Sequence, residues 1–407
     1  TGKPPMDGTL RVLAISGASV LEVQGESLPS DGFFKSLIEL VAAELGWPAT
    51  RLQLLSGGQA LTVETPPLPA GDHDLQVIRQ PLLTQYTWEA VEAVDRGRPD
   101  LLKEILARGQ DPNVHEGLLL QGAVTRNSAQ VLQVLLSARA HVNLTDNCGR
   151  TCLHAAIEEG AGGMLEPLLA AGAAVNQADR WGKSPLHAMA STRDLENLEH
   201  LIKARAVLDQ TDHSGATALF LAVAHSQVAT AERLLAAKAS VNKANSRDLA
   251  PLEAALSASL GETTSQMVRL LVRARAEKDR INRSGDTPLS LAIRQKSLDG
   301  LSALIECAAD MEKSDRDGAT ALYSAAWAGL DEAISLLIQV GVEIDRQNDG
   351  GDTALHAASW QGHVQAVSRL AEAKACLDQP NADGDGPLHA AAQRGHVQAV
   401  RCLMLSR

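Results

Sequence analysis

The chain has 407 residues, of which 45% are hydrophobic and only 2% aromatic. This length exceeds one ordinary compact domain, so we expect two or more units, built from closely packed Ala, Leu and Val helices. The 37 Lys and Arg residues against 49 Asp and Glu give a net charge of -12, which makes nucleic acid a poor partner on electrostatic grounds.

The five cysteines are scattered and odd in number, which is typical of a reduced compartment. Cys148 and Cys152 lie close together, but no second Cys or His pair at zinc-ligand spacing accompanies them, so we expect no metal and no cofactor. No apolar stretch reaches the roughly 20 residues of a membrane span, so we expect no membrane insertion. These features predict an intracellular, cytoplasmic protein. Because the chain does not begin with Met, a targeting segment could already have been removed.

Residues 1–9 are predicted to be a tail, and residues 10–80 a small α+β domain. "LRVLAISGASVLEVQG" indicates two strands joined by a turn that contains Gly, and "SDGFFKSLIELVAAELG" indicates an amphipathic helix. "LQLLSGG" and "HDLQVIR" indicate further strands. The predicted order is therefore ββαββ.

This order resembles the β-grasp domain of ubiquitin, especially in "LEV" at 21–23, "GGQAL" at 57–61 and the closing "LQVIRQ". The resemblance implies that the hydrophobic patch through which ubiquitin is recognised would include Leu55 and Ile78. The terminal Gly-Gly of ubiquitin is absent, and Gln59 stands where a chain-linking lysine would be, so conjugation is not expected. Such a domain would either dock a partner or cap the rest of the chain.

From residue 86 onward the sequence repeats. One leucine recurs every 33 residues, except for a single step of 37 between Leu252 and Leu289. The nine members of this column are Leu120, Leu153, Leu186, Leu219, Leu252, Leu289, Leu322, Leu355 and Leu388. The four extra residues belong to "SASLGETTSQ", which we expect to extend a loop between two helices.

Other columns keep this register and predict units of hairpin, helix, turn and helix. Two residues before most leucines stands a Thr or Ser that can cap a helix, followed in several units by a Pro at the first helical position. A Gly four residues before the leucine supplies the positive φ of a hairpin tip. Ten residues before the leucine a polar side chain is placed to bond amides of the hairpin loop. His154, His187, His356 and His389 follow the leucine and are predicted to fix turns.

The repeated sequence motif resembles the ankyrin repeat, as in "GKSPLHAMA", "GDTALHAASWQGHVQAV" and "GDGPLHAAAQRGHVQAV". The resemblance covers residues 86–407: a capping repeat at 86–112 and then about nine repeats, the last incomplete. Ala250 and Gly386 replace the capping Thr, and Asp248 replaces the hairpin Gly. The predicted fold class is a mainly α ankyrin-repeat solenoid, preceded by a small α+β ubiquitin-like β-grasp domain.

A solenoid of this kind presents a concave surface, and the ankyrin resemblance implies protein recognition there. Gly-rich phosphate loops and the nucleophile-elbow pattern are absent from the sequence, so we expect no enzyme. The leading hypothesis is a non-enzymatic scaffold or adaptor with a protein partner. Two alternatives stay open: a ubiquitin-pathway adaptor whose repeats select the client, and a structural subunit of a larger assembly.

Tryptophans mark the candidate binding positions, since Trp and Arg are enriched in interface hot spots. One lies at a predicted hairpin tip between two basic residues, and two end inner helices one repeat apart, with charged residues on nearby hairpins. The candidates are Arg180, Trp181, Lys183, Arg316, Trp327, Asp352 and Trp360. The alternative for Trp327 and Trp360 is that their rings fill gaps between repeats.

Overall fold

The computed structural model describes residues 9–13, 19–24, 52–56, 59–60, 73–79, 85–258 and 261–406. It forms two compact units, Thr1–Asp111 and Pro112–Arg407. The division lies after the two helices that we expected to form the first repeat. Among the residues described, no helix has the length and apolar character needed to cross a membrane.

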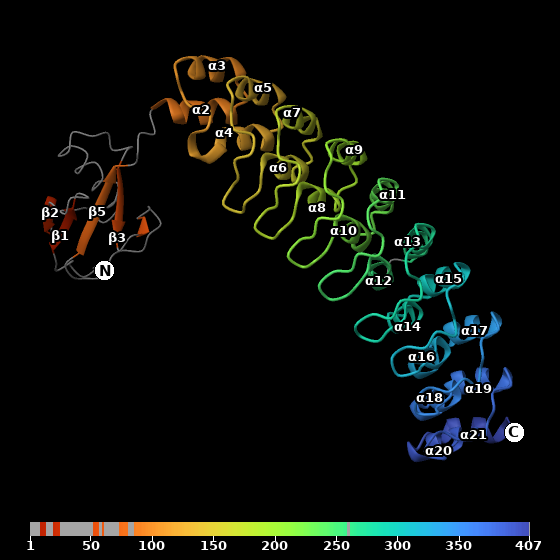
Figure 1. The fold of residues 1–407 in the computed structure, drawn as a ribbon. Coiled ribbons are helices and arrows are strands. Elements are labelled where there is room, and N and C mark those ends of the chain that lie inside the picture. Colours follow the sequence, from red (N-terminus) through yellow and green to blue (C-terminus); the bar gives the residue numbers. More distant parts are fainter. Residues whose placement is uncertain are drawn as a thin grey trace. The chain divides into compact units, whose positions relative to one another are not determined.

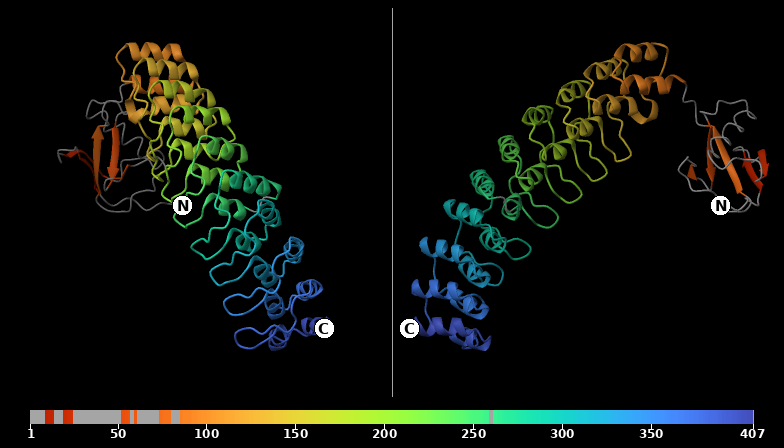
Figure 2. Two further views of the ribbon diagram at one scale, coloured as in Figure 1. Left: turned by 45° about the vertical axis from the view of Figure 1, so that its right-hand side comes forward. Right: turned by 180° about the vertical axis from the view of Figure 1, so that it is seen from behind.

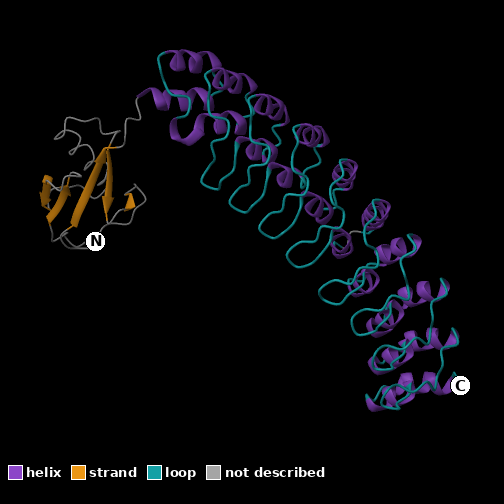
Figure 3. Ribbon diagram, viewed as in Figure 1, coloured by secondary structure: helices purple, strands orange, loops and turns teal. Residues whose placement is uncertain are grey.

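The first unit contains one five-stranded sheet, coloured orange in Figure 3. Its strands are β1 (Thr9–Leu13), β2 (Ser19–Gln24), β3 (Leu52–Ser56), β4 (Gln59–Ala60) and β5 (His73–Arg79), in the order β2-β1-β5-β3-β4. β1 pairs with β5 in parallel, and the other neighbours are antiparallel. The helix expected in residues 30–46 lies outside the described residues, so the ubiquitin-like interpretation stays a prediction.

Two helices complete this unit: α2 (Gln85–Asp95) and α3 (Pro99–Ala107), which pack against each other. Ala90 and Ala93 of α2 are buried, as are Leu102 and Ile105 of α3. Pro99 opens α3, at a position where the missing amide hydrogen is not needed. These two helices occupy the segment in which the capping repeat is expected.

The second unit is an array of nine helix pairs over its described residues (Figure 1). The inner helices are α4 (Val114–Thr125), α6 (Cys152–Glu158), α8 (Pro185–Met189), α10 (Ala218–Ala224), α12 (Pro251–Ser257), α14 (Pro288–Arg294), α16 (Ala321–Ala328), α18 (Ala354–Gln361) and α20 (Pro387–Gln393). The outer helices are α5 (Ala129–Ser137), α7 (Leu165–Ala170) after a short 3-10 turn, α9 (Leu195–Lys203), α11 (Val228–Ala236), α13 (Glu262–Arg273), α15 (Leu298–Glu306), α17 (Asp331–Gln339), α19 (Val364–Glu372) and α21 (Val397–Leu405). The last repeat, expected to be incomplete, has both helices.

The predicted capping residues begin the inner helices. The hydroxyl of Thr217 accepts a hydrogen bond from the amide of Phe220 at 3.2 Å, and that of Thr287 accepts one from the amide of Ser290 at 3.1 Å. These bonds satisfy amides that a helix leaves unpaired at its first turn. Pro residues open α8, α12, α14 and α20, as predicted.

The core is a column of leucines and alanines that runs through the array. The repeated leucine is buried in every repeat from Leu120 to Leu355. Each inner helix packs against the inner helix of the next repeat and against its own outer helix, as α16 does with α18 and α17. One helix pair therefore buries its apolar faces only when neighbours cover them.

The polar column ten residues before each leucine bonds amides of hairpin loops, as predicted, and the loop is that of the next repeat. The Oδ1 atom of Asn176 accepts a hydrogen bond from the amide of Val207 at 2.8 Å, 31 residues further along the chain. The same bond recurs from Asn143 to Ala174 and from Asp345 to Cys376. Because the acceptor lies in one repeat and the amide in the next, this column fixes the spacing between repeats.

The hairpin tips form a second link between repeats. The amide of Arg180 donates to the carbonyl of Cys148 at 2.9 Å, and the amide of Ala382 donates to the carbonyl of Gly350 at 3.0 Å. The close approach explains the hairpin glycine: at Gly351, whose φ is +77°, a Cβ would lie 2.6 Å from the amide nitrogen of Ala382.

The repeats around the four-residue insertion depart from this pattern. Asp248 replaces the hairpin glycine there, and its carboxylate pairs with Arg280, which also approaches the buried Glu253 at 3.4 Å. The insertion does more than extend a loop, which corrects that expectation. α13 has 12 residues, where most outer helices have nine, and the hydroxyl of Ser265 in its first turn donates to the carbonyl of Asp299 at 2.8 Å. Part of the insertion therefore lengthens an outer helix at its N-terminal end.

The repeated histidines fix turns, as predicted. The Nδ1 atom of His154 accepts a hydrogen bond from the amide of Thr151 at 3.1 Å, and its Nε2 atom bonds the carbonyl of Lys183 in the next repeat at 3.0 Å. His187 and His356 make the corresponding bonds. His389 makes the first of these bonds and is otherwise exposed. His154, His187 and His356 therefore each link the hairpin turn of their own repeat to the next repeat.

Replacing Leu219 with Ala should lower the free energy of unfolding by about 2 to 5 kcal/mol, because this fully buried side chain leaves a cavity. Hydrogen exchange measured along the chain should rise first in the repeats around 186–252, since each repeat is stabilised by its neighbours. Val207→Ala, at a side chain that is 51% exposed, is the control and should change little. A uniform rise along the array would contradict this expectation.

Acidification should weaken the histidine-containing repeats selectively. Burial lowers the pKa of His154, His187 and His356, although hydrogen bonds to carbonyls of the next repeat oppose this shift. The unfolded chain then binds more protons as the pH falls through about 6.5, so the stability present above that pH is lost below it. Burial raises the pKa of Glu253, which acts in the opposite direction. Protection factors from hydrogen exchange at pH 7.5 and 5.5 should fall around the three histidines more than around Glu253; equal losses would overturn the assignment.

Candidate functional site

The concave side of Pro112–Arg407 is formed by the inner helices and the hairpin loops. The loops, teal in Figure 3, extend to this side in every repeat, while the outer helices lie on the convex side (Figure 2). The inner helices bury their leucines between repeats, so the side chains that remain at their exposed ends and at the hairpins define this surface. Any large cavity here is a candidate for partner binding.

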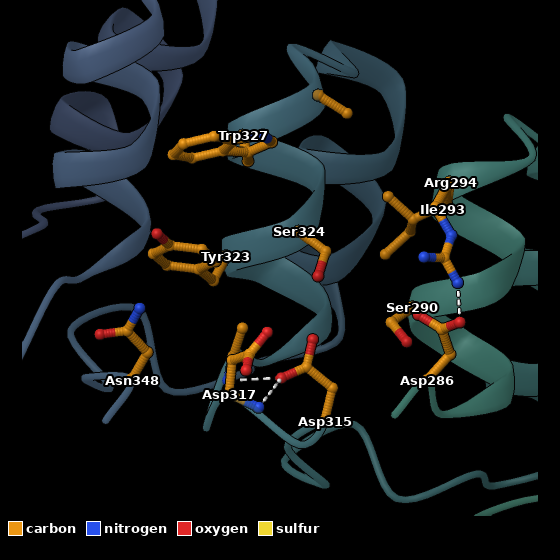
Figure 4. A pocket seen from close by; sticks show the side chains of 12 residues that line it. Asp286, Ser290, Ile293, Arg294, Asp315, Asp317, Tyr323, Ser324, Trp327 and Asn348 are labelled. Atoms are coloured by element: carbon orange, nitrogen blue, oxygen red, sulfur yellow. Dashed lines mark hydrogen bonds and ion pairs between the residues drawn. The ribbon is translucent and has the colours of Figure 1, made fainter. Parts of the chain in front are cut away.

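A pocket of about 400 Å³ lies on this surface between α14 and α16 and the hairpins that precede them (Figure 4). Two successive repeats supply most of its lining, and the next hairpin supplies one residue. The lining residues are Asp286, Ser290, Ile293, Arg294, Asp315, Asp317, Ala319, Tyr323, Ser324, Trp327, Ala328 and Asn348. The volume lies within the range of pockets that hold small molecules or a partner's side chain.

An aromatic pair forms one wall of the pocket. Tyr323 and Trp327 are one turn apart on α16, and their rings stack with centroids 6.3 Å apart and an interplanar angle of 18°. Tyr323 is half-buried, whereas Trp327 is 45% exposed. Burial, reinforced by Asp352, Asp315 and Asp317, raises the pKa of the Tyr323 hydroxyl to about 12. The phenol stays neutral because an anion there would be desolvated and close to carboxylates.

Three carboxylates give the pocket an acidic character. Asp286 forms an ion pair with Arg294 on α14. The Oδ1 atom of Asp315 accepts hydrogen bonds from the amides of Asp317 and Ala319, which fixes the hairpin turn. Among the described residues, no basic side chain lies within ion-pair distance of Asp315 or Asp317. Two of the three negative charges are therefore available to a ligand.

Of the predicted tryptophans on inner helices, Trp327 lies in the pocket and Trp360 lies outside it. The guanidinium carbon of Arg394, from the next repeat, lies 4.7 Å from the ring centroid of Trp360. The backbone carbonyls of both tryptophans accept hydrogen bonds from histidines of the next repeat, His363 and His396. The two tryptophans therefore make the same backbone hydrogen bond to the next repeat. Their rings differ, because only the ring of Trp360 is in contact with an arginine.

The other predicted binding residues are not brought to this pocket. Trp181 is 51% exposed at the tip of the hairpin before α8, three hairpins from the nearest one that lines the pocket, and Lys183 beside it is also exposed. The side chain of Arg180 donates to the carbonyl of Asn147, so it has a structural partner.

Two more of the predicted residues lie on hairpins close to the pocket without lining it. Arg316 is exposed on its hairpin. The Oδ1 atom of Asp352 accepts a hydrogen bond from Asn381 at 2.9 Å. Leu55 and Ile78 belong to β3 and β5 of the first unit, and their side chains lie outside the described residues.

Tyr323 and the pocket's aspartates were not among the predicted binding residues. Tyr323 occupies the column that holds histidine in four other repeats, and this departure from a repeated column would have been a signal for it. The aspartates gave no such signal. Asp315 stands in a column of Asp and Asn, and the hairpin-tip column of Asp317 varies from repeat to repeat.

A protein-family model described as "Ankyrin repeats (3 copies)" matches residues 90–179, 161–245, 254–348 and 332–407. Among solved structures, the chain is similar to the ankyrin repeat domain of Bcl-3, which its title calls a unique member of the IkappaB protein family. The match has 24% sequence identity and a TM-score of 0.50, and it covers 55% of this chain and 99% of that one. This similarity indicates the fold alone. No curated protein matches the sequence.

Replacing each tryptophan with Ala should lower the free energy of unfolding by different amounts. Trp360→Ala removes a half-buried ring and its contact with Arg394, so the free energy of unfolding should fall by about 1 to 3 kcal/mol. Trp327→Ala removes a more exposed ring and should cost about 1 kcal/mol or less. Denaturant unfolding of both variants checks this order. The assignment fails if Trp327→Ala is the more destabilising substitution.

Proposed function

The chain belongs to the ankyrin-repeat family, and we propose that it is a non-enzymatic scaffold that binds a partner protein on the concave side of Pro112–Arg407. The family match supports a role in protein–protein interaction. The choice of the concave side is supported by the pocket at α14 and α16, which opens where the hairpins and inner helices meet.

The observation that carries the proposal is the exposure of Trp327. The chain has only five tryptophans, and its core is built from leucine and alanine. The ring of Trp327 is 45% exposed and stacks on Tyr323, so it lies at the surface and does not fill the core. Such rings are typical interface anchors, because they give a large contact area and lose little conformational freedom on binding.

The charge distribution favours a protein over a nucleic acid. The net charge is -12, and the pocket contains Asp286, Asp315 and Asp317 against the single cation Arg294. Phosphates would be repelled at this surface, since nucleic-acid binding depends on neutralisation by basic side chains.

A second candidate is an adaptor in which the first unit docks the ubiquitin machinery while the repeats select a client. The sheet order β2-β1-β5-β3-β4, with its parallel pair of β1 and β5, supports a β-grasp domain. Leu55 pairs with Gln76, and Ile78 pairs with Gln53, so the two proposed patch residues lie two register positions apart on paired strands. Loss of binding to ubiquitin-pathway proteins on Leu55→Ala and Ile78→Ala would support this candidate.

A partner recovered by cross-linking to the full chain tests the scaffold proposal. Trp327→Ala should weaken its binding by about 2 kcal/mol while thermal melting barely changes, because an exposed anchor contributes to the complex more than to the fold. Trp88→Ala is the matched control, since Trp88 is 62% exposed on α2. Equal affinity of wild type and Trp327→Ala, or equal losses in both variants, would contradict the proposed binding face.

A further inference from the structure

The chain contains its own example of how these tryptophans interact with a cation. Arg394 lies over the ring of Trp360, with its guanidinium carbon 4.7 Å from the ring centroid. Guanidinium groups are attracted to the negative face of an indole, and Trp gives the strongest such interaction among the aromatic side chains. One repeat therefore covers the tryptophan of the preceding repeat with an arginine.

The equivalent cation is missing at Trp327. One period of 33 residues before Arg394 stands Gln361, whose side chain carries no charge. Trp327 is correspondingly more exposed than Trp360. The indole of Trp327 is therefore left without the arginine contact that Arg394 gives to Trp360 one repeat later.

Two acidic residues of the same pocket add a negative potential near Trp327, from the far side of Tyr323 (Figure 4). Asp315 and Asp317 have no ion-pair partner among the described residues, while Arg294 is already paired with Asp286. Carboxylates that no cation neutralises attract a positively charged side chain bound nearby. Burial is the main cause of the raised pKa of Tyr323, and Asp352, Asp315 and Asp317 add to it.

We propose that the pocket beside α16 binds an arginine side chain of the partner protein, with its guanidinium stacked on Trp327 in the negative potential of Asp315 and Asp317. This inference deepens the proposed scaffold function and rests on it. The cavity of about 400 Å³ has room for a long side chain, and its open side admits the rest of a peptide segment.

The repeats themselves supply substitutions that change the charge and keep the hairpin. Asp315 stands at a position occupied by Asn in four other hairpins, at 245, 282, 348 and 381, where the side-chain oxygen accepts equivalent amide bonds. Asp315→Asn therefore removes the charge without losing the turn. Asp317→Ser restores the residue found at 214 and 284. Asp179→Asn with Asp212→Asn is the matched control, because it removes two hairpin carboxylates far from the pocket.

A random 12-residue peptide library selected on the full chain is the probe. Arginine should be enriched at one fixed position among the peptides, and a synthetic binder should lose at least about 10-fold in affinity when that arginine is replaced by neutral citrulline. Replacement by lysine should also weaken binding. Asp315→Asn with Asp317→Ser should weaken the same peptide at least about 5-fold, and the control pair should not.

A reciprocal exchange tests the stacking itself. Gln361→Arg should place the chain's own guanidinium over Trp327, as Arg394 lies over Trp360, and should weaken the arginine peptide at least about 10-fold. Arg394→Gln should leave its affinity unchanged. Unchanged binding in Gln361→Arg would overturn the proposed geometry.

The outcomes separate this inference from the function on which it rests. Peptides that require Trp327 but contain no conserved arginine, or bind equally with lysine or citrulline, would overturn the arginine site and leave the concave binding face standing. Equal losses in the control pair would indicate general attraction to an acidic protein and would also overturn it. A failure to select any peptide that depends on Trp327 would overturn both.

Discussion

One hydrogen bond between neighbouring repeats sets the geometry on which the array depends. A carboxylate or amide oxygen in one repeat accepts from a backbone amide 31 residues later, as Asn176 does from Val207 and Glu312 does from Glu343. Because this bond forms only when neighbouring repeats lie at one separation, a change in their spacing would break it. Where four extra residues intervene, the bond persists from Asn242 to Glu277, and the additional length is taken up elsewhere.

This spacing separates the residues that build the fold from those available for binding. Most of the repeated leucines, the capping threonines and three of the four turn histidines are used between repeats and are buried. Positions at the hairpin tips and at the exposed ends of inner helices are left to vary, and Trp181 and Trp327 lie there. A repeat protein can therefore change its binding chemistry at one place without changing its core, because each repeat contacts only its neighbours.

Much of the repeat fold could be predicted from the sequence because its signals recur at a fixed period. The threonine caps, opening prolines and turn histidines each have a local physical role, and the structure confirms those roles. The destination of the polar column was not predictable in this way, since a bond to the next repeat depends on a distance in space between residues 31 apart. The same limit applies to Trp327 and Trp360. They are equivalent in sequence, yet their exposure differs with the residue that the following repeat supplies, Gln361 or Arg394.

The central claim is that a partner protein binds the concave side of Pro112–Arg407 at the pocket beside α16. Hydrogen exchange of the full chain, measured with and without a bound partner, tests it most directly, because amides in a contact surface become protected. Added protection is expected in the hairpin at 315–319 and in α14 and α16, with little change in the outer helices α15 and α17. Protection confined to the outer helices, or to the sheet of the first unit, would contradict it.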